Sequence, residues 1–219
     1  MCFSATASFA AGAFLLGVGA MTMKAARTPR QVPFAAIPLL FAIQQLTEGV
    51  VWWTFSHDAP LLNSVMTHLY SFFSHVLWPV YVPLAVLLME PSGWRRTALS
   101  AVVAIGAAVG AYLLYVLVAF PVVSQPVGQH IEYVSPHFFA ALTMTLYLIA
   151  TTTSLLLSAH LRVRVFGAAS MLAFAVAYAF YSRWFISVWC FFAALLSVLV
   201  VFHLAALPIS GNRRQLQRN

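Results

Sequence analysis

The stretch IPLLFAIQQLTEGVVW, residues 37–52, decides the class of fold. It lies within a longer apolar run, residues 33–55, in which Glu48 is the only charged residue. A helix needs about 20 mainly apolar residues to cross a hydrocarbon core of about 30 Å. We therefore interpret this run as a transmembrane helix that places one carboxyl group at membrane depth.

The composition of the whole chain supports a membrane protein. Of its 219 residues, 63% are hydrophobic and 7% are charged, whereas an ordinary globular domain has roughly 25% charged residues. The net charge is +7, but the basic residues occur in twos and threes between apolar runs. Because nucleic-acid sites need clustered basic side chains, we expect no nucleic-acid partner.

The chain contains six further apolar runs of similar length, and turn residues or charged residues separate them. The connection at residues 121–135 is too polar and proline-rich for a span, and the boundary between the last two spans, at Ser182 and Arg183, has almost no loop. The sequence predicts an all-α polytopic bundle in one domain, residues 1–209, followed by a basic tail, residues 210–219. The seven expected transmembrane helices are residues 4–23, 33–55, 62–89, 97–120, 136–160, 165–181 and 184–207.

The basic residues predict the orientation of the bundle. Short loops rich in Lys and Arg stay in the cytoplasm, and ten of the eleven basic residues fall in alternate connections or in the tail, with only Arg183 on the opposite side. We therefore expect the N-terminus outside, the C-terminus in the cytoplasm, and a place in a bacterial inner membrane. The ten are Lys24, Arg27, Arg30, Arg95, Arg96, Arg162, Arg164, Arg213, Arg214 and Arg218.

Glu48 is the first candidate for a functional residue. An ionisable group at membrane depth costs about 2.5 to 3.5 kcal/mol on insertion and is a functional-site hypothesis by default. Gln44, Gln45 and Trp52 share its helix face, since positions three and four apart are neighbours. A structural hydrogen bond between helices is the alternative explanation for Glu48.

His68 and His75 are the second candidates. Seven residues are close to two helical turns, so the two imidazoles are expected on one stripe of residues 62–89, with Ser71 between them. If this helix and residues 33–55 form an antiparallel pair, the stripe can face Glu48. The sequence thus predicts a site centred on Glu48, His68 and His75, with structural hydrogen bonding as the alternative.

The predicted outer face holds further side chains that bind transition metals, above all zinc. His130 and His137 are candidate extra ligands, and Cys2 is a candidate neighbour of the site. We interpret His57 and Asp58 as ordinary loop residues and Cys190 as packing. His160 and His203 fall at cytoplasmic helix ends, where a histidine more often caps a helix or faces water.

Two stretches carry a resemblance to a known family. The opening MCFSATASF, residues 1–9, and residues 37–52 resemble an uncharacterised family of small bacterial multi-span proteins that begin with the same signature. The likeness covers most of the chain and brings no activity with it. It implies that Cys2, Gln44, Gln45 and Glu48 belong to the recognisable part of the family.

A weaker likeness is to the membrane zinc hydrolases of the alkaline ceramidase and adiponectin-receptor type. Those proteins have seven spans and combine a Glu, an S-x-x-x-H motif and a paired-His motif around one zinc ion. This chain has Glu48 and Ser71-x-x-x-His75, but its late spans offer only His203. The resemblance implies catalytic roles for Glu48 and Ser71, and His130 or His137 would have to complete the ligand set.

The leading hypothesis is therefore an outward-facing intramembrane site for a transition metal, which serves hydrolytic or redox chemistry on a membrane-soluble substrate. Zinc is the first choice, and copper or haem are others. The alternative is a metal-free proton-coupled transporter or ligand sensor. Retinal is excluded because the only lysine, Lys24, lies at a helix end. A G-x-x-x-G spacing at Gly106 and Gly110 also allows close packing or self-association of helices.

Overall fold

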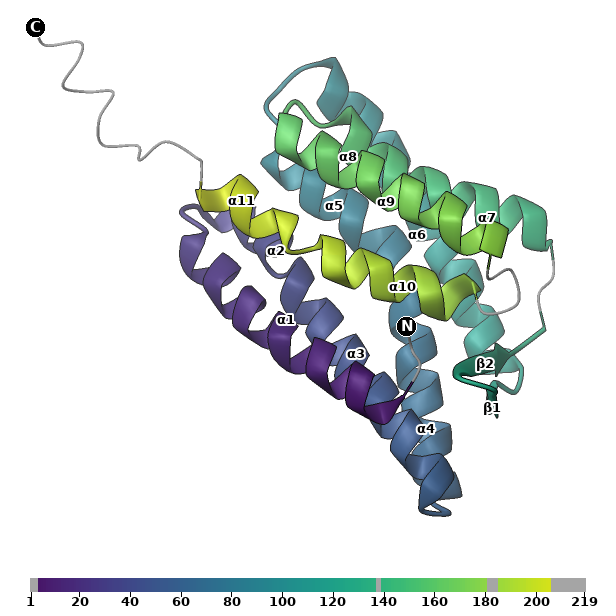
Figure 1. Cartoon of the computed structure of the whole chain (residues 1–219). Helices are drawn as coiled ribbons and strands as arrows, with labels where there is room; N and C mark the ends of the chain where they lie inside the picture. Colours follow the sequence, from purple (N-terminus) through teal and green to yellow (C-terminus); the bar gives the residue numbers. More distant parts are fainter. Residues whose placement is uncertain (1–3, 137–138, 181–184, 206–219) are drawn as a thin grey trace, which may run out of the picture.

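The computed structural model describes residues 4–136, 139–180 and 185–205, and their helices form one bundle (Figure 1). Cys2, His137 and the basic tail lie outside the described residues. Six helical segments are long and apolar enough to cross a membrane, which confirms the predicted all-α membrane bundle. They are Ala5–Ala25, Pro29–Ser56, Pro60–Met89, Trp94–Ala119, Ala140–Leu157 and Leu161–Phe180.

The seventh segment is shorter and broken. The helices α10 (Phe185–Leu196) and α11 (Leu199–Ala205) are interrupted at Ser197, whose hydroxyl group donates to the Ala194 carbonyl at 2.6 Å. Figure 1 shows α10 and α11 running between the α1 and α3 side of the bundle and the α9 side, where α11 packs on α1 and α10 packs on α9. The last predicted span is thus two short helices in line.

Three of the long segments change helix type along their length. The second consists of η1 (Pro29–Gln31), α2 (Val32–Ala35) and α3 (Ile37–Ser56). The third and fifth each contain a π-helical segment, named η2 and η3. In chain order these are α4 (Pro60–Ser71), η2 (Phe72–Leu77) and α5 (Trp78–Met89), then α7 (Ala140–Leu148), η3 (Ile149–Thr153) and α8 (Ser154–Leu157). The helices α1 (Ala5–Ala25), α6 (Trp94–Ala119) and α9 (Leu161–Phe180) are regular throughout.

The connection after α6 is a β-hairpin, which the sequence did not predict. Strands β1 (Val123–Val127) and β2 (His130–Val134) pair antiparallel around a two-residue turn. Gly128 begins this turn with φ of +61°, a conformation that side chains disfavour but that primed hairpin turns need. The all-α bundle therefore carries a small sheet at one end.

Small residues allow the helices to approach closely. A Cβ atom on Gly106 of α6 would lie 1.9 Å from the Pro79 carbonyl oxygen, and one on Gly110 would lie 2.7 Å from Val80 Cγ2. Both glycines are thus used in packing α6 against α5 within the chain. The G-x-x-x-G spacing has an internal purpose, and self-association through it stays a prediction.

Candidate functional site

The three polar residues predicted on α3 lie inside the protein. The side chains of Gln44, Gln45 and Glu48 are fully buried, so the bundle shields them from lipid. Trp78 Nε1 of α5 donates a hydrogen bond of 2.7 Å to Gln44 Oε1. Neither amide atom of Gln45 has a hydrogen-bond partner. An unpaired buried amide costs about 1 to 3 kcal/mol, and this cost singles out the position.

Cys190 of α10 joins this group. Its thiol is buried, and the side chains of Gln44, Tyr70 and Glu48 lie close to it. Tyr70 of α4 is itself fully buried. We call Gln44, Gln45, Glu48, Tyr70 and Cys190 the central polar cluster. It joins α10 to α3 and α4, which lie much earlier in the sequence.

A cavity of about 100 Å³ lies beside the central polar cluster, and Cys190 forms part of its wall. Most of the wall is apolar, from α6, α7 and the residues around the hairpin. One water needs about 10 to 15 Å³ by the same kind of measure, so the cavity has room for a small molecule. Its polar side chains come from several elements and include Ser71, Ser74, His75, Tyr133, Thr143, Tyr147 and Cys190.

The π-helical segment η2 places His75 in this cavity. Each hydrogen bond of a π-helix spans five residues instead of four, and such segments occur frequently at functional sites. His75 Nδ1 lies 2.8 Å from Ser74 Oγ and 3.2 Å from the Ser71 carbonyl oxygen, which holds the ring against its own helix. The predicted closeness of Ser71 and His75 is therefore present, and both side chains line the cavity.

Ser71 shows that the cavity wall has unused hydrogen-bonding capacity. Its side-chain oxygen is buried and has no hydrogen-bond partner. A buried hydroxyl group normally finds a partner, and this one borders the cavity. The position is suited to a polar group of a molecule bound there.

The described residues do not bring Glu48, His68 and His75 together as a group that could hold a metal ion. No group of three His, Cys, Asp or Glu residues that could hold a metal ion occurs in the part of the chain that the structure describes. His68 lies on α4 before the π-helical segment, and its Nδ1 atom lies 2.8 Å from the Ser64 carbonyl oxygen. Because η2 changes the helical repeat between them, seven residues no longer place the two imidazoles on one stripe. Metal binding, whether of zinc, copper or haem, stays a prediction.

The other predicted site residues do not line the cavity or lie outside the described residues. Trp52 is partly buried on α3, and its Nε1 atom has no hydrogen-bond partner. His130 lies in β2 and is buried, and burial lowers the pKa of its imidazole below the ordinary value. Cys2 and His137 lie outside the described residues, so their roles stay predictions.

A chain of hydrogen bonds holds the hairpin on the helices next to the cavity. Asn63 Nδ2 donates to Thr54 Oγ1 at 2.8 Å, and Ser124 Oγ of β1 donates to Asn63 Oδ1 at 3.0 Å. Thr67 Oγ1 then donates to Ser124 Oγ at 2.7 Å. The ring of Tyr133 in β2 stacks on Tyr70 with centroids 4.5 Å apart. The hairpin thereby links the cavity wall to the central polar cluster.

A second cavity of about 40 Å³ lies further along the bundle, between α3, α5, η3 and α9. Tyr147, Trp189 and Cys190 line both cavities. The Tyr147 hydroxyl group donates to the Ser74 carbonyl at 2.6 Å, so this wall is fixed to the helix that holds His75. The two cavities thus share a boundary at Cys190.

Sequence reasoning missed several residues of the site. Cys190 was interpreted as packing, and Tyr70, Tyr133 and Tyr147 were assigned no role. Their positions have no periodic signal, because each comes from a different element. His57 is an exposed residue at the end of α3, stacked on Trp53 with centroids 3.9 Å apart, as expected for a loop residue.

The chain belongs to the family DUF6629, a family of unknown function, whose model matches residues 1–215. This confirms the expected membership of an uncharacterised family. No curated protein and no solved structure matches the chain significantly. The chemistry of the site therefore has to be argued from its own geometry.

Proposed function

We propose that this protein is a membrane-embedded binding protein, a sensor or carrier, for a small molecule with one polar end and an apolar body. The observation that carries the proposal is the cavity of about 100 Å³, in which the partnerless hydroxyl oxygen of Ser71 borders an otherwise mostly apolar wall. Ligand sites typically combine apolar walls with a few placed polar groups.

The cavity wall combines two kinds of chemistry. Ser71, Ser74 and His75 provide hydroxyl and imidazole groups on one helix, while Leu113 and Val116 provide an apolar wall from α6. A molecule that places a hydroxyl, carbonyl or amine against Ser71 and its apolar part along α6 satisfies both. Such molecules partition into membranes, which suits a site inside a helix bundle.

The central polar cluster supports a role in responding to the ligand. Glu48 lies fully buried beside the thiol of Cys190, and Cys190 lines the cavity. A bound molecule therefore changes the surroundings of a buried carboxyl group through one intervening residue.

The proposal is tested by a substitution in the cavity wall that fills the cavity with a larger side chain. Leu113→Trp places an indole in the cavity, whereas Leu114→Trp adds the same group to the exposed neighbouring position on α6. Native mass spectrometry of detergent-purified protein is expected to show a co-purified small molecule on the wild type and on Leu114→Trp, and at least about tenfold less on Leu113→Trp, a loss of about 1.4 kcal/mol in binding. Equal occupancy of the two variants contradicts the proposal.

A further inference from the structure

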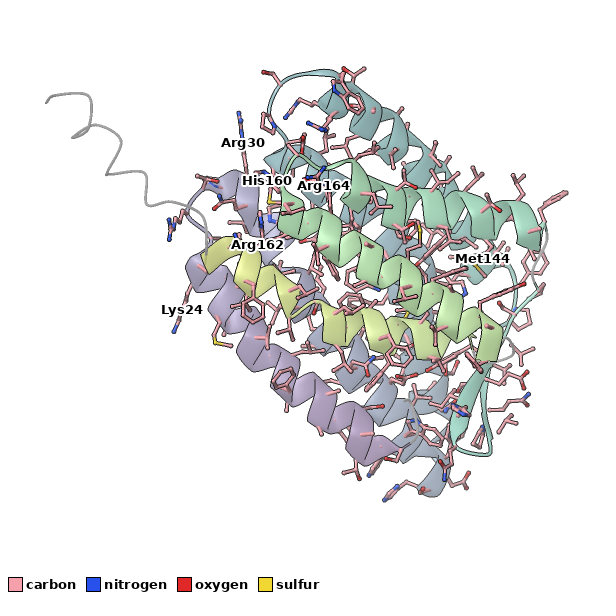
Figure 2. The ribbon with its side chains drawn as sticks, turned by 45° about the horizontal axis from the view of Figure 1, so that its top comes forward. Lys24, Arg30, Met144, His160, Arg162 and Arg164 are labelled. Atoms are coloured by element: carbon pink, nitrogen blue, oxygen red, sulfur yellow. The ribbon has the colours of Figure 1, made fainter. Side chains whose placement is uncertain are left out.

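The end of the bundle where α1 finishes and α9 starts is strongly basic. Figure 2 shows Lys24, Arg30, His160, Arg162 and Arg164 at this one end, far from Met144 in the cavity wall. They come from three separate segments: the last turn of α1, η1, and the start of α9. Basic clusters at the cytoplasmic ends of membrane helices attract anionic lipids.

The carboxylate of Glu90, near this end of the bundle, already accepts hydrogen bonds within the protein. Glu90 is buried, and its two carboxylate oxygens accept hydrogen bonds from the backbone N–H of Ala159 at 3.0 and 3.1 Å. The hydroxyl group of Ser158 donates to the same carboxylate at 3.2 Å. Glu90 therefore fixes the connection between α8 and α9 and orients His160, which follows directly.

Two histidines meet beside this connection. The rings of His160 and His203 lie with centroids 5.1 Å apart, and Phe34 of α2 packs edge-on against His203 at 5.7 Å. His203 is 3% exposed, so the expectation that it faces water is wrong. Its Nε2 atom is buried and has no hydrogen-bond partner. A buried imidazole with one unused nitrogen, next to basic residues, is suited to donate a hydrogen bond to an anion.

Arg162 completes the arrangement. It is exposed in the first turn of α9, and its charge acts on His203. The N-terminus of a 20-residue helix such as α9 carries partial positive charge and favours anions. The guanidinium group of arginine matches phosphate geometry with paired hydrogen bonds.

We propose that His160, His203 and Arg162 form a site for the phosphate group of an anionic lipid headgroup. The site lies where three helical segments end, which is the level of headgroups for helices that cross a bilayer. His203 provides a donor from the protein interior, and Arg162 provides the charge from the surface. This site is separate from the cavity beside the central polar cluster, and its existence does not depend on the ligand proposed there.

The test compares lipids and matched charge variants of the full chain. Detergent-purified protein is titrated with short-chain phosphatidylglycerol, with phosphatidylcholine of the same chains, and with inorganic phosphate, and bound molecules are counted by native mass spectrometry. We expect phosphatidylglycerol to bind and the other two to bind at least about tenfold more weakly. Arg162→Gln is expected to weaken phosphatidylglycerol binding about tenfold, whereas Lys24→Gln removes the same charge from the same end and is expected to leave it unchanged.

His203→Phe tests the buried donor. Phenylalanine preserves the ring packing against Phe34 and His160 but removes both nitrogen atoms, so phosphatidylglycerol binding is expected to fall as in Arg162→Gln. Equal binding of the two lipids, or equal losses in Arg162→Gln and Lys24→Gln, would overturn the site and indicate a diffuse charge effect. Inorganic phosphate that binds as tightly as the lipid would overturn the headgroup assignment. Arg162 is exposed, so its variant tests the site even if His203→Phe does not fold.

Discussion

At the level of single residues, Gln45 and Ser71 are the clearest examples of buried polar side chains whose hydrogen bonds are not made within the protein. Both place polar atoms without partners inside the bundle, one in the central polar cluster and the other in the cavity wall. Within a membrane no water replaces a missing hydrogen bond unless a cavity admits it. Both positions therefore retain unused hydrogen-bonding capacity, and of the two only Ser71 lines the cavity of the proposed ligand.

Gly106 allows a sharp test of helix packing. Gly106→Ala places a methyl group 1.9 Å from the Pro79 carbonyl oxygen, which is backbone and cannot rotate away. We expect a loss of about 1 to 3 kcal/mol in stability from overpacking, measured as a lower thermal midpoint in detergent. Gly17→Ala is the control, because a Cβ atom there has nothing within 4 Å, and its better helix propensity predicts an equal or higher midpoint. Equal midpoints for the two variants would show that α5 and α6 are further apart than described.

His130 predicts a pH dependence of the hairpin. Burial lowers the pKa of this imidazole in the folded hairpin, so the detached hairpin binds the proton more readily. The attached hairpin is therefore most stable above pH of about 6.5, the ordinary histidine pKa, and loses stability as the pH falls below it. Hydrogen exchange of the amides in β1 and β2, corrected for intrinsic rates, should show less protection at acidic pH. His130→Gln should largely remove this dependence; an unchanged pH profile in that variant would assign the effect to another group.

The residues of the site were only partly predictable. Glu48, Gln44 and Gln45 were found from the sequence, because polar groups within a 23-residue apolar run, residues 33–55, have to be buried in protein. Cys190 was not found, because a cysteine in an apolar run resembles ordinary packing. Its place in the cluster depends on α10 lying against α3, and such long-range contacts leave no periodic signal in one sequence.

At the level of elements, the π-helical segments account for the main difference between prediction and structure. A regular helix places His68 and His75 on one face, and the sequence contains nothing that forbids it. The segment Phe72–Leu77 instead adopts five-residue hydrogen bonding where α6 packs on it, and Gly110 provides the close approach. The imidazole of His75 lines the cavity, and His68 does not.

The attachment of the β-hairpin to the helices depends on Ser124. Ser124→Ala removes the acceptor of the Thr67 hydroxyl group and the donor to Asn63 in a buried contact, so we expect the hairpin to lose about 1 to 3 kcal/mol of attachment. The measurement is hydrogen exchange of the β1 and β2 amides. Gln125→Ala, on the neighbouring exposed position, removes one surface hydrogen bond to Glu132 and should change exchange by much less. Similar effects of the two substitutions would mean that the contact with α4 does not hold the hairpin.

At the scale of the whole molecule, hydropathy was sufficient for the architecture. Long apolar runs between charged loops predicted the six long helices, because no soluble surface can be built from such a composition. Hydropathy does not predict the break in the last segment, because Ser197 lies in an apolar run. Its hydroxyl group donates a hydrogen bond to a carbonyl of its own helix. Helix ends shifted by a few residues, because capping and packing decide them locally.

The orientation of the bundle is the remaining prediction, and the placement of loops makes it testable. Thr28 lies at the basic end between α1 and η1, and Asp58 lies in the opposite loop between α3 and α4; both are exposed. In a Cys2→Ser background, where Cys190 is buried, Asp58→Cys should react with a membrane-impermeant maleimide on intact cells. Thr28→Cys should react only after the membrane is permeabilised. The physical reason is that positively charged short loops are retained in the cytoplasm, and Lys24, Arg27 and Arg30 flank Thr28. The reverse labelling pattern would invert the bundle, moving the proposed headgroup site to the outer leaflet and the hairpin beside the cavity to the cytoplasm.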